Sequence, residues 1–252
     1  MTDAALLKAL SRLEVSPHPL VQVHSIASPG DMVVVDGVYR DWTAVRDLAL
    51  QQEFTRDRSE YPGKRALLQA HIPGLDRLIA RVLCPGHLIQ LEQEVTFSQL
   101  DALRDFRPEQ HVPHRDGKVQ VGGLIFLTEA DAFGGGTGFF RHRSTGLLGV
   151  FLGDPDLVQA ARRGGYPGVD AMLVEIVRPS PTASIYNDTP SDAWELVHLV
   201  ELRANRLLLF DARLFHAPML DSRPDRGMRL TQNLFLRVVP EAPRIRFRPL
   251  PR

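Results

Sequence analysis

Apolar and polar residues follow two different periods along the chain. In its first third, apolar side chains recur every three or four residues, which is typical of amphipathic helices. This pattern predicts helices over 2–14, 41–54 and 75–83. Between the first two of these helices, the run Met32–Val35 is rich in β-branched residues and predicts a strand. The Asp36-Gly37 pair that follows favours a turn at its end.

From residue 87 onward the pattern favours short strands. Apolar or alternating runs separated by turns predict strands over 87–97, 120–127, 138–140, 195–202, 206–210 and 230–239. Short strands in series are typical of a sandwich or a small barrel. We therefore expect a mainly β fold with flanking helices, in one domain. Residues 1–86 are expected to form an N-terminal flank of helices and a strand, and residues 87–240 the β core.

One segment within this core, 144–192, does not have the pattern of strands. Asp154-Pro155 predicts the start of a helix and Gly164-Gly165 its end. Residues 180–191 are rich in Ser, Thr and Pro and predict a loop. An insertion of this length is uncommon unless it covers a site, so we expect a lid or wall of the substrate site.

Charge and cysteine content narrow the range of functions. Basic and acidic residues number 30 each, and a net charge of zero argues against a general nucleic-acid binder. The single cysteine, Cys84, excludes an internal disulfide, an iron–sulfur cluster and a thiolate zinc site. No apolar run is long enough to span a membrane, and the first residues lack a signal-peptide pattern. We therefore expect a cytoplasmic protein without a membrane partner.

One of the nine histidines precedes a carboxylate by two residues, in His114-Arg115-Asp116. On a strand, residues two apart point to the same face of the sheet. The pair would then supply two ligands of a site with two histidines and one carboxylate, which leaves three positions open on an octahedral metal. Taken alone, the pair is more typical of a surface turn before Gly117.

Two features about a hundred residues later favour the metal site. The apolar strand predicted over 206–210 is followed by His216, which could bring a third ligand from a distant strand; a core or turn histidine is the alternative. On the next strand, Arg229, Thr231 and Asn233 share one face, while leucines fill most of the other. An arginine on an inner face is costly unless it meets an anion, and its fork matches a carboxylate.

In this order, the motifs resemble those of the iron(II)/2-oxoglutarate-dependent dioxygenases, and most closely their prolyl-4-hydroxylase-like branch. The matching segments are Pro113-His114-Arg115-Asp116, Leu124-Ile125-Phe126-Leu127, Gly135-Gly136-Thr137-Gly138-Phe139-Phe140, Leu208-Leu209-Phe210-Asp211, His216-Ala217-Pro218 and Gly227-Met228-Arg229. The resemblance covers roughly residues 90–240 and implies a double-stranded β-helix, or jelly-roll, core.

The resemblance also implies a site and its cofactors. His114, Asp116 and His216 would hold Fe(II) and form the catalytic centre. Arg229 would bind the distal carboxylate of the co-substrate 2-oxoglutarate, with the Thr231 hydroxyl as a helper, and O₂ would be the oxidant. Arg229 stands where collagen-type members of the branch have lysine.

The activity implied is hydroxylation of an amino-acid-like or other small metabolite of bacterial metabolism, with natural-product metabolism as one option. Since related halogenases lack the carboxylate ligand, Asp116 favours hydroxylation or desaturation. One alternative is a cupin-like metal-binding isomerase or a non-catalytic binding protein, but neither needs the carboxylate clamp that Arg229 would provide. A further alternative is a peptide or protein hydroxylase, although the size of the 144–192 insertion favours a covered small-molecule site.

Four other features favour ordinary structural roles. His111 is expected to support the site from outside or to be structural. His142 fits a solvated basic turn at least as well as a contact with an anionic substrate. The three glycines at 134–136 are typical of a tight turn, since no phosphate-loop lysine follows. The segment 61–65 is expected to be an exposed turn, with lining of the site as its alternative.

Overall fold

The structure of the 252-residue chain is a computed structural model. It describes residues 13–56, 62–68, 72, 74–84, 88–91, 95–101, 112–117, 119–129, 135–151, 153–176, 178, 192–220, 228–239 and 242–250. The predicted helix over 2–14 lies almost wholly outside these residues, as do His111 and Gly134.

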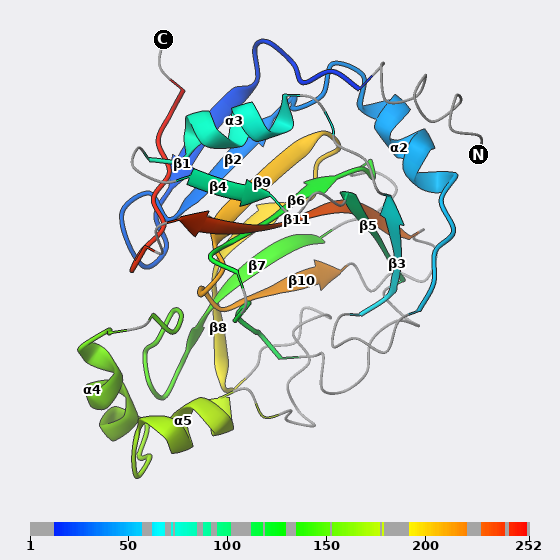
Figure 1. The fold of residues 1–252 in the computed structure, drawn as a ribbon. Helices are drawn as coiled ribbons and strands as arrows, with labels where there is room; N and C mark the ends of the chain where they lie inside the picture. The colour runs from blue at the N-terminus through cyan, green and yellow to red at the C-terminus, as the bar shows by residue number, and fades with distance from the viewer. Residues whose placement is uncertain are drawn as a thin grey trace.

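Two antiparallel β-sheets form the body of the molecule (Figure 1). Within the described residues the larger sheet has eight strands, in the order β1-β2-β9-β6-β11-β5-β3, and β4 also pairs with β11. These strands are β1 (Leu20–His24), β2 (Met32–Asp36), β3 (Lys64–Leu68), β4 (Leu88–Leu91), β5 (Val95–Leu100), β6 (Val121–Phe126), β9 (Arg206–Asp211) and β11 (Arg229–Val239). The predicted strand over 87–97 corresponds to β4 and β5, which pair with successive parts of β11.

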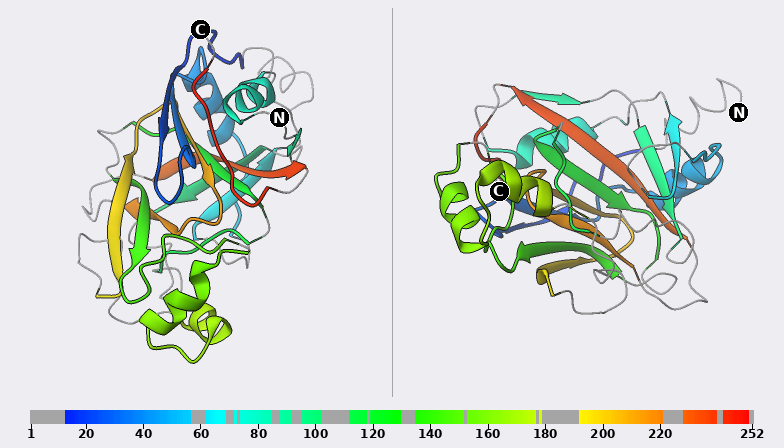
Figure 2. Two further views of the ribbon diagram at one scale, coloured as in Figure 1. Left: turned by 90° about the vertical axis from the view of Figure 1, so that its left-hand side faces the viewer. Right: turned by 90° about the horizontal axis from the view of Figure 1, so that it is seen from below.

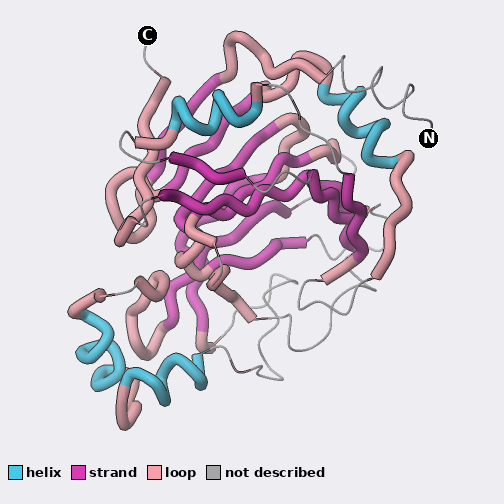
Figure 3. The backbone as a smooth tube through the Cα atoms, viewed as in Figure 1, coloured by secondary structure: helices cyan, strands magenta, loops and turns pink. Residues whose placement is uncertain are grey.

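The smaller sheet has the order β10-β7-β8 and lies opposite the larger one (Figure 3). Its strands are β7 (Gly135–His142), β8 (Trp194–Glu201) and β10 (His216–Leu220). The chain crosses between the sheets from β6 to β7 and again at each step from β8 to β11. Repeated crossing of this kind is the arrangement of a jelly roll, so the predicted fold class is confirmed.

The central strands are apolar on both sides because both of their faces are covered. In β9, Leu207 and Leu209 belong to the core that the larger sheet forms with the helices. Their neighbours Leu208 and Phe210 belong to a second core, which includes Phe139 of the smaller sheet. A continuous apolar run such as this one is typical of a strand buried on both faces.

Helices α2 (Trp42–Leu50) and α3 (Leu75–Val82) cover the outer face of the larger sheet (Figure 1). Helix α2 begins at a side-chain cap, since the Asp41 carboxylate accepts a hydrogen bond from the Ala44 amide. That helix ends earlier than predicted, because Thr55 forms a β-bridge with Arg65. Among the described residues, no helix has the length and apolar character needed to cross a membrane.

Strands from both predicted parts of the chain form the larger sheet. β1, β2 and β3 precede residue 87, and they pair with one another or with β5 and β9 of the predicted core. The described part of the segment 1–86 thus extends the sheet as well as covering it. The division of the domain at 86/87 stays a prediction.

The insertion contains α4 (Asp156–Arg163), as predicted, and also α5 (Val169–Ile176), which was not predicted. Both helices lie at the periphery, beyond the smaller sheet (Figure 2). Their buried residues Ala160 and Met172 share a core cluster with Trp194 and Phe215 of the β body. The two helices are therefore packed against the domain through their apolar residues.

Candidate metal centre and adjoining pocket

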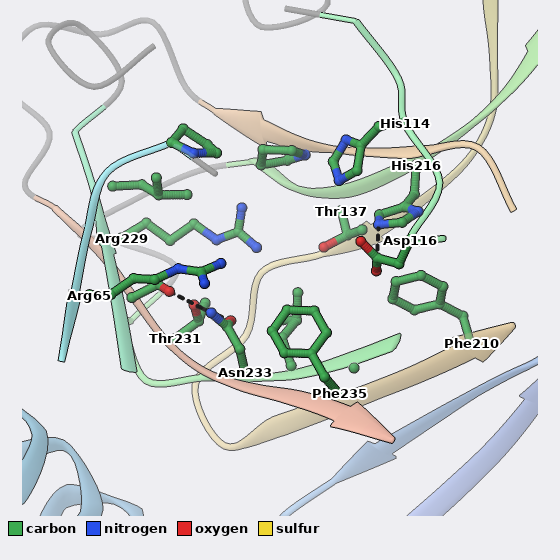
Figure 4. Close-up of a pocket in the computed structure, with 16 residues that line it drawn as sticks. Arg65, His114, Asp116, Thr137, Phe210, His216, Arg229, Thr231, Asn233 and Phe235 are labelled. Carbon is green, nitrogen blue, oxygen red and sulfur yellow. Dashed lines mark hydrogen bonds and ion pairs between the residues drawn. The ribbon is translucent and has the colours of Figure 1, made fainter. Parts of the chain in front are cut away.

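A pocket lies between the two sheets, with polar and charged groups at both of its ends (Figure 4). It is lined by Pro62, Arg65, Ser98, Leu100, His114, Asp116, Gly123, Leu124, Thr137, Phe210, His216, Pro218, Arg229, Thr231, Asn233 and Phe235. Its volume is about 110 Å³. Since one water needs roughly 10–15 Å³, the pocket has room for a small molecule.

Three side chains at one end of the pocket form the cluster that the sequence predicts. His114, Asp116 and His216 each offer a ligand atom, and these atoms all lie within 4.8 Å of one another. His216 Nε2 is 3.6 Å from Asp116 Oδ2, and the rings of the two histidines are 4.5 Å apart. Among the described residues this is the one group of three or more such side chains that could hold a metal ion.

Backbone hydrogen bonds hold the cluster together. The amide of His114 donates to the His216 carbonyl and the His216 amide donates to the His114 carbonyl, both at 2.9 Å. The Asp116 amide donates to the Ala212 carbonyl at 2.8 Å. The expectation that His114 and Asp116 share one strand is wrong in detail, since only His114 forms a β-bridge and residues 115–117 are irregular. The separate bond to Ala212 directs Asp116 to the cluster instead.

A hydrogen bond also orients the His216 ring. Its Nδ1 lies 2.9 Å from the Leu214 carbonyl oxygen, and a carbonyl can only accept, so Nδ1 carries the proton. In the neutral ring the other nitrogen, Nε2, is the one without a proton, and it faces Asp116. A histidine held in this way by a carbonyl is the usual arrangement for a metal ligand.

The pKa of His114 is lowered to about 4, chiefly by burial and also by the neighbouring His216, while Asp116 opposes both effects. A histidine binds metal as the neutral imidazole, so a low pKa keeps this ligand ready at ordinary pH.

In the metal-free protein, lowering the pH from 8 to 5 is expected to reduce the free energy of unfolding by about 2 kcal/mol through His114. Its folded-state pKa of about 4 lies below the ordinary value of 6.5. The unfolded chain therefore takes up the proton first, and the stability present above pH 6.5 is lost as the pH falls toward 4. Urea unfolding of the wild type and of His114→Asn at both pH values measures this. An equal loss in both proteins would contradict the expectation.

Gly122 lies next to the cluster, and a side chain at this position would collide with neighbouring side chains. A Cβ at this position would lie 2.9 Å from Phe210 Cζ and 3.2 Å from Asp116 Oδ2. Both contacts are tighter than ordinary van der Waals separation, and both involve side chains that line the pocket.

Gly122→Ala is accordingly expected to displace Asp116 and weaken divalent-metal binding by about tenfold, a loss typical of disturbed support around a ligand. Gly168→Ala is the matched control, because a Cβ there has nothing within 4 Å. Equilibrium dialysis with Mn(II) compares the two variants. Equal affinities would show that the space under Asp116 does not matter.

The other end of the pocket holds Arg229, Thr231 and Asn233, which share one face of β11 as predicted. Arg229 is 2% exposed, and its guanidinium carbon lies 5.1 Å from the centre of the Phe126 ring. On the opposite face of β11, Leu230, Leu234 and Leu236 pack into the core that the helices cover.

A chain of polar groups runs beside Arg229. The Thr231 hydroxyl donates to Asn233 Oδ1 at 3.0 Å, and Asn233 Nδ2 donates to the Ser98 hydroxyl. Thr137 is 2% exposed, and its Oγ1 has no hydrogen-bond partner among the described residues. This hydroxyl lies between Arg229 and Asp116 in Figure 4. The pocket thus contains a buried hydroxyl that a ligand could engage.

Pro62, Arg65 and Ser98 also line the pocket, although 61–65 was expected to be an exposed turn and no role was predicted for Ser98. For Arg65 and Pro62 the alternative of lining the site is correct. Ser98 could have been found from its polar position between the apolar Phe97 and Leu100 of a short strand. Arg65 gave no such signal, because β3 is too short and too polar at its start to be predicted.

The described part of 144–192 contributes no residue to the pocket lining. The apolar residues of α4 and α5 pack against the β body. The expectation that the insertion forms a lid or wall of the substrate site stays a prediction. Residues 179–191 lie outside the described residues. For His142 the expectation of a solvated turn is wrong, because the side chain is buried and its Nδ1 lies 2.9 Å from the Thr145 hydroxyl. It is not among the residues that line the pocket.

Comparisons with known proteins give a family and several similar structures. The family model for DUF6445, a family of unknown function, matches residues 17–236. No curated protein sequence matches the chain. HygX from Streptomyces hygroscopicus, with nickel and 2-oxoglutarate bound, is similar in structure with a TM-score of 0.41, 16% identity, and 82% of both chains covered.

Two further structures are similar at the same level. The alpha-ketoglutarate-dependent carbocyclase SnoK from nogalamycin biosynthesis has a TM-score of 0.40 and 12% identity, covering 82% of this chain and 79% of its own. A prolyl-4-hydroxylase of Pseudomonas putida has a TM-score of 0.35 and 15% identity, covering 93% of this chain and 97% of its own.

Proposed function

The chain belongs to the DUF6445 family, and we propose that it is an Fe(II)- and 2-oxoglutarate-dependent oxygenase that hydroxylates an amino-acid-like or other small metabolite. One observation carries the proposal. A cluster of two histidines and one carboxylate and a buried arginine occupy the two ends of a single pocket.

The cluster fits a divalent iron ion. Its donors are two imidazoles and one carboxylate, the set that non-heme Fe(II) oxygenases use to leave adjacent positions open. The Leu214 carbonyl holds His216 in the tautomer that offers Nε2 to a metal. His114, with its lowered pKa, is neutral at ordinary pH and also ready to bind.

The remainder of the pocket fits 2-oxoglutarate. Arg229 offers a planar fork that matches a carboxylate in two-point contact. The Thr137 hydroxyl is buried and has no partner among the described residues, which is unusual in a folded protein unless a ligand or water satisfies it. It stands between the metal cluster and Arg229, where the body of a short dicarboxylate would lie.

When bound, iron and 2-oxoglutarate supply the oxidising chemistry with O₂. The chain's own residues position and shield the reactants. Arg229 and Thr137 orient the co-substrate, and the Phe210 and Phe235 side chains provide apolar walls that exclude water from the cavity. His114, Asp116 and His216 would hold the metal, and a set of three protein ligands would leave coordination positions for the co-substrate and O₂.

An arginine at the end of the pocket opposite the metal cluster supports an oxygenase over a cupin-like isomerase. The substrate itself is proposed only by class. A hydroxylase of peptides remains the second candidate, to be separated by the same assay.

The test is succinate release by the Fe(II)-loaded protein with 2-oxoglutarate and panels of amino acids, other small acids and short peptides. Substrate-stimulated succinate release with a small molecule, absent from His216→Ala, is the expected result. Stimulation by peptides alone would assign the second candidate. No succinate with any compound, together with no 2-oxoglutarate binding, would overturn the proposed function.

A further inference from the structure

A second arginine, Arg65, lies in the same pocket as Arg229 and has no part in the function proposed above. The pairing of the strands explains its position. Arg65 of β3 is paired with Ser98 of β5, and Ser98 is paired with Thr231 of β11. Residues directly opposite one another on neighbouring strands share a face of the sheet, so all three face the pocket.

The two arginines lie next to each other. In Figure 4 both side chains extend from the same side of the pocket, with their guanidinium groups directed toward the metal cluster. Arg229 belongs to the adjacent row of the sheet, where it is paired with Leu100. Arg65 Nε is buried, and Arg229 is almost completely so. The guanidinium groups are thus partly withdrawn from solvent, where charges interact more strongly than in water.

The polar chain beside the arginines has a direction. Thr231 gives its hydroxyl hydrogen to Asn233, and Asn233 gives an amide hydrogen to Ser98. Since Ser98 accepts the last of these hydrogen bonds, its own hydroxyl hydrogen can be donated to a ligand. Ser98 lies in the row between Arg65 and Thr231, so this donor is located beside the arginines.

We propose that Arg65 and Arg229 together hold the far carboxylate of 2-oxoglutarate, with Ser98 as the hydroxyl donor. This inference rests on the proposed function. A carboxylate has two oxygens with about four acceptor positions, enough for both arginines and a hydroxyl. Arg65 is then a positioning residue on a strand outside the predicted core, and it makes the pocket selective for 2-oxo acids with a second carboxylate.

The test measures binding to the Mn(II)-loaded protein by isothermal titration calorimetry, with two probes. One is 2-oxoglutarate, and the other is 2-oxopentanoate, which has the same chain length but lacks the far carboxylate. Arg65→Gln is expected to weaken 2-oxoglutarate binding by about tenfold or more, the loss typical of a charge-assisted hydrogen bond, and to leave 2-oxopentanoate binding unchanged. Lys64→Gln, one residue away on the same strand, is the matched control and should alter neither.

Two further variants keep the test decisive. Arg65→Lys retains the charge and should bind 2-oxoglutarate better than Arg65→Gln does. In the double variant Arg65→Gln/Arg229→Gln, the loss should be smaller than the product of the single losses, since both residues contact one carboxylate.

Unchanged 2-oxoglutarate binding in Arg65→Gln would overturn the inference, as would an equal loss with both probes. If the wild type binds 2-oxopentanoate and 2-oxoglutarate equally, the two-arginine anchor is wrong while the proposed function stands. If the wild type binds neither probe, the proposed function itself fails, and this inference with it.

Discussion

His216→Ala is expected to weaken divalent-metal binding by on the order of 100-fold or more. Loss of a group that merely supports a ligand typically costs 10–100-fold, and the removal of a ligand should cost at least as much. The backbone of His216 also positions His114, because the two residues donate amide hydrogen bonds to each other's carbonyl oxygens. Asp116→Ala should have a similar effect, because it removes the only carboxylate of the described cluster.

Calorimetric titration with Mn(II) measures this loss, and His18→Ala, at an exposed histidine, serves as the control. Thermal unfolding of the metal-free variants shows whether they are folded. Metal binding that survives in both His216→Ala and Asp116→Ala would place the ion elsewhere and remove the basis of the proposed function.

Arg229→Ala is expected to weaken 2-oxoglutarate binding by roughly 10- to 100-fold while metal binding is retained. The variant loses a charge-assisted, two-point contact with a carboxylate in a cavity shielded from water. Mn(II) affinity should be unaffected, because the metal ligands come from other strands and loops.

Arg237→Ala is the matched control, since Arg237 is an exposed arginine near the far end of the same strand, β11. Titration of the Mn(II)-loaded variants with 2-oxoglutarate gives the comparison. If Arg229→Ala and Arg237→Ala bind it equally well, the co-substrate is held by some other group.

Strands with strong local patterns could be predicted from the sequence. Over most of β11, polar residues alternate with apolar ones. This alternation predicted both the strand and the face of it that carries Arg229. β9 is a continuous apolar run, and its burial on both faces explains why. In segments where one hydrophobic pattern dominates, as in these two strands, the predicted element is present in the structure.

The parts that could not be predicted depend on pairing between distant segments. Arg65 reaches the pocket only because β3 pairs with β5, and a five-residue strand starting with two cations has no period that reveals this. Asp116 lies in irregular backbone that is held by a hydrogen bond to Ala212. The spacing of residues on a strand therefore predicted correctly that Asp116 lies near His114, although Asp116 is not on a strand. The insertion had a pattern of loop and helix, which shows its structure but does not show which surface it packs against.

The most direct test of the account is a crystal structure of the protein grown with Mn(II) and 2-oxoglutarate. The account predicts one Mn(II) ion bound by His114, Asp116 and His216, with the 2-oxo acid end of the co-substrate on the ion and the far carboxylate against Arg229. An ion bound away from these three residues, or 2-oxoglutarate found outside the cavity between the two sheets, would contradict it.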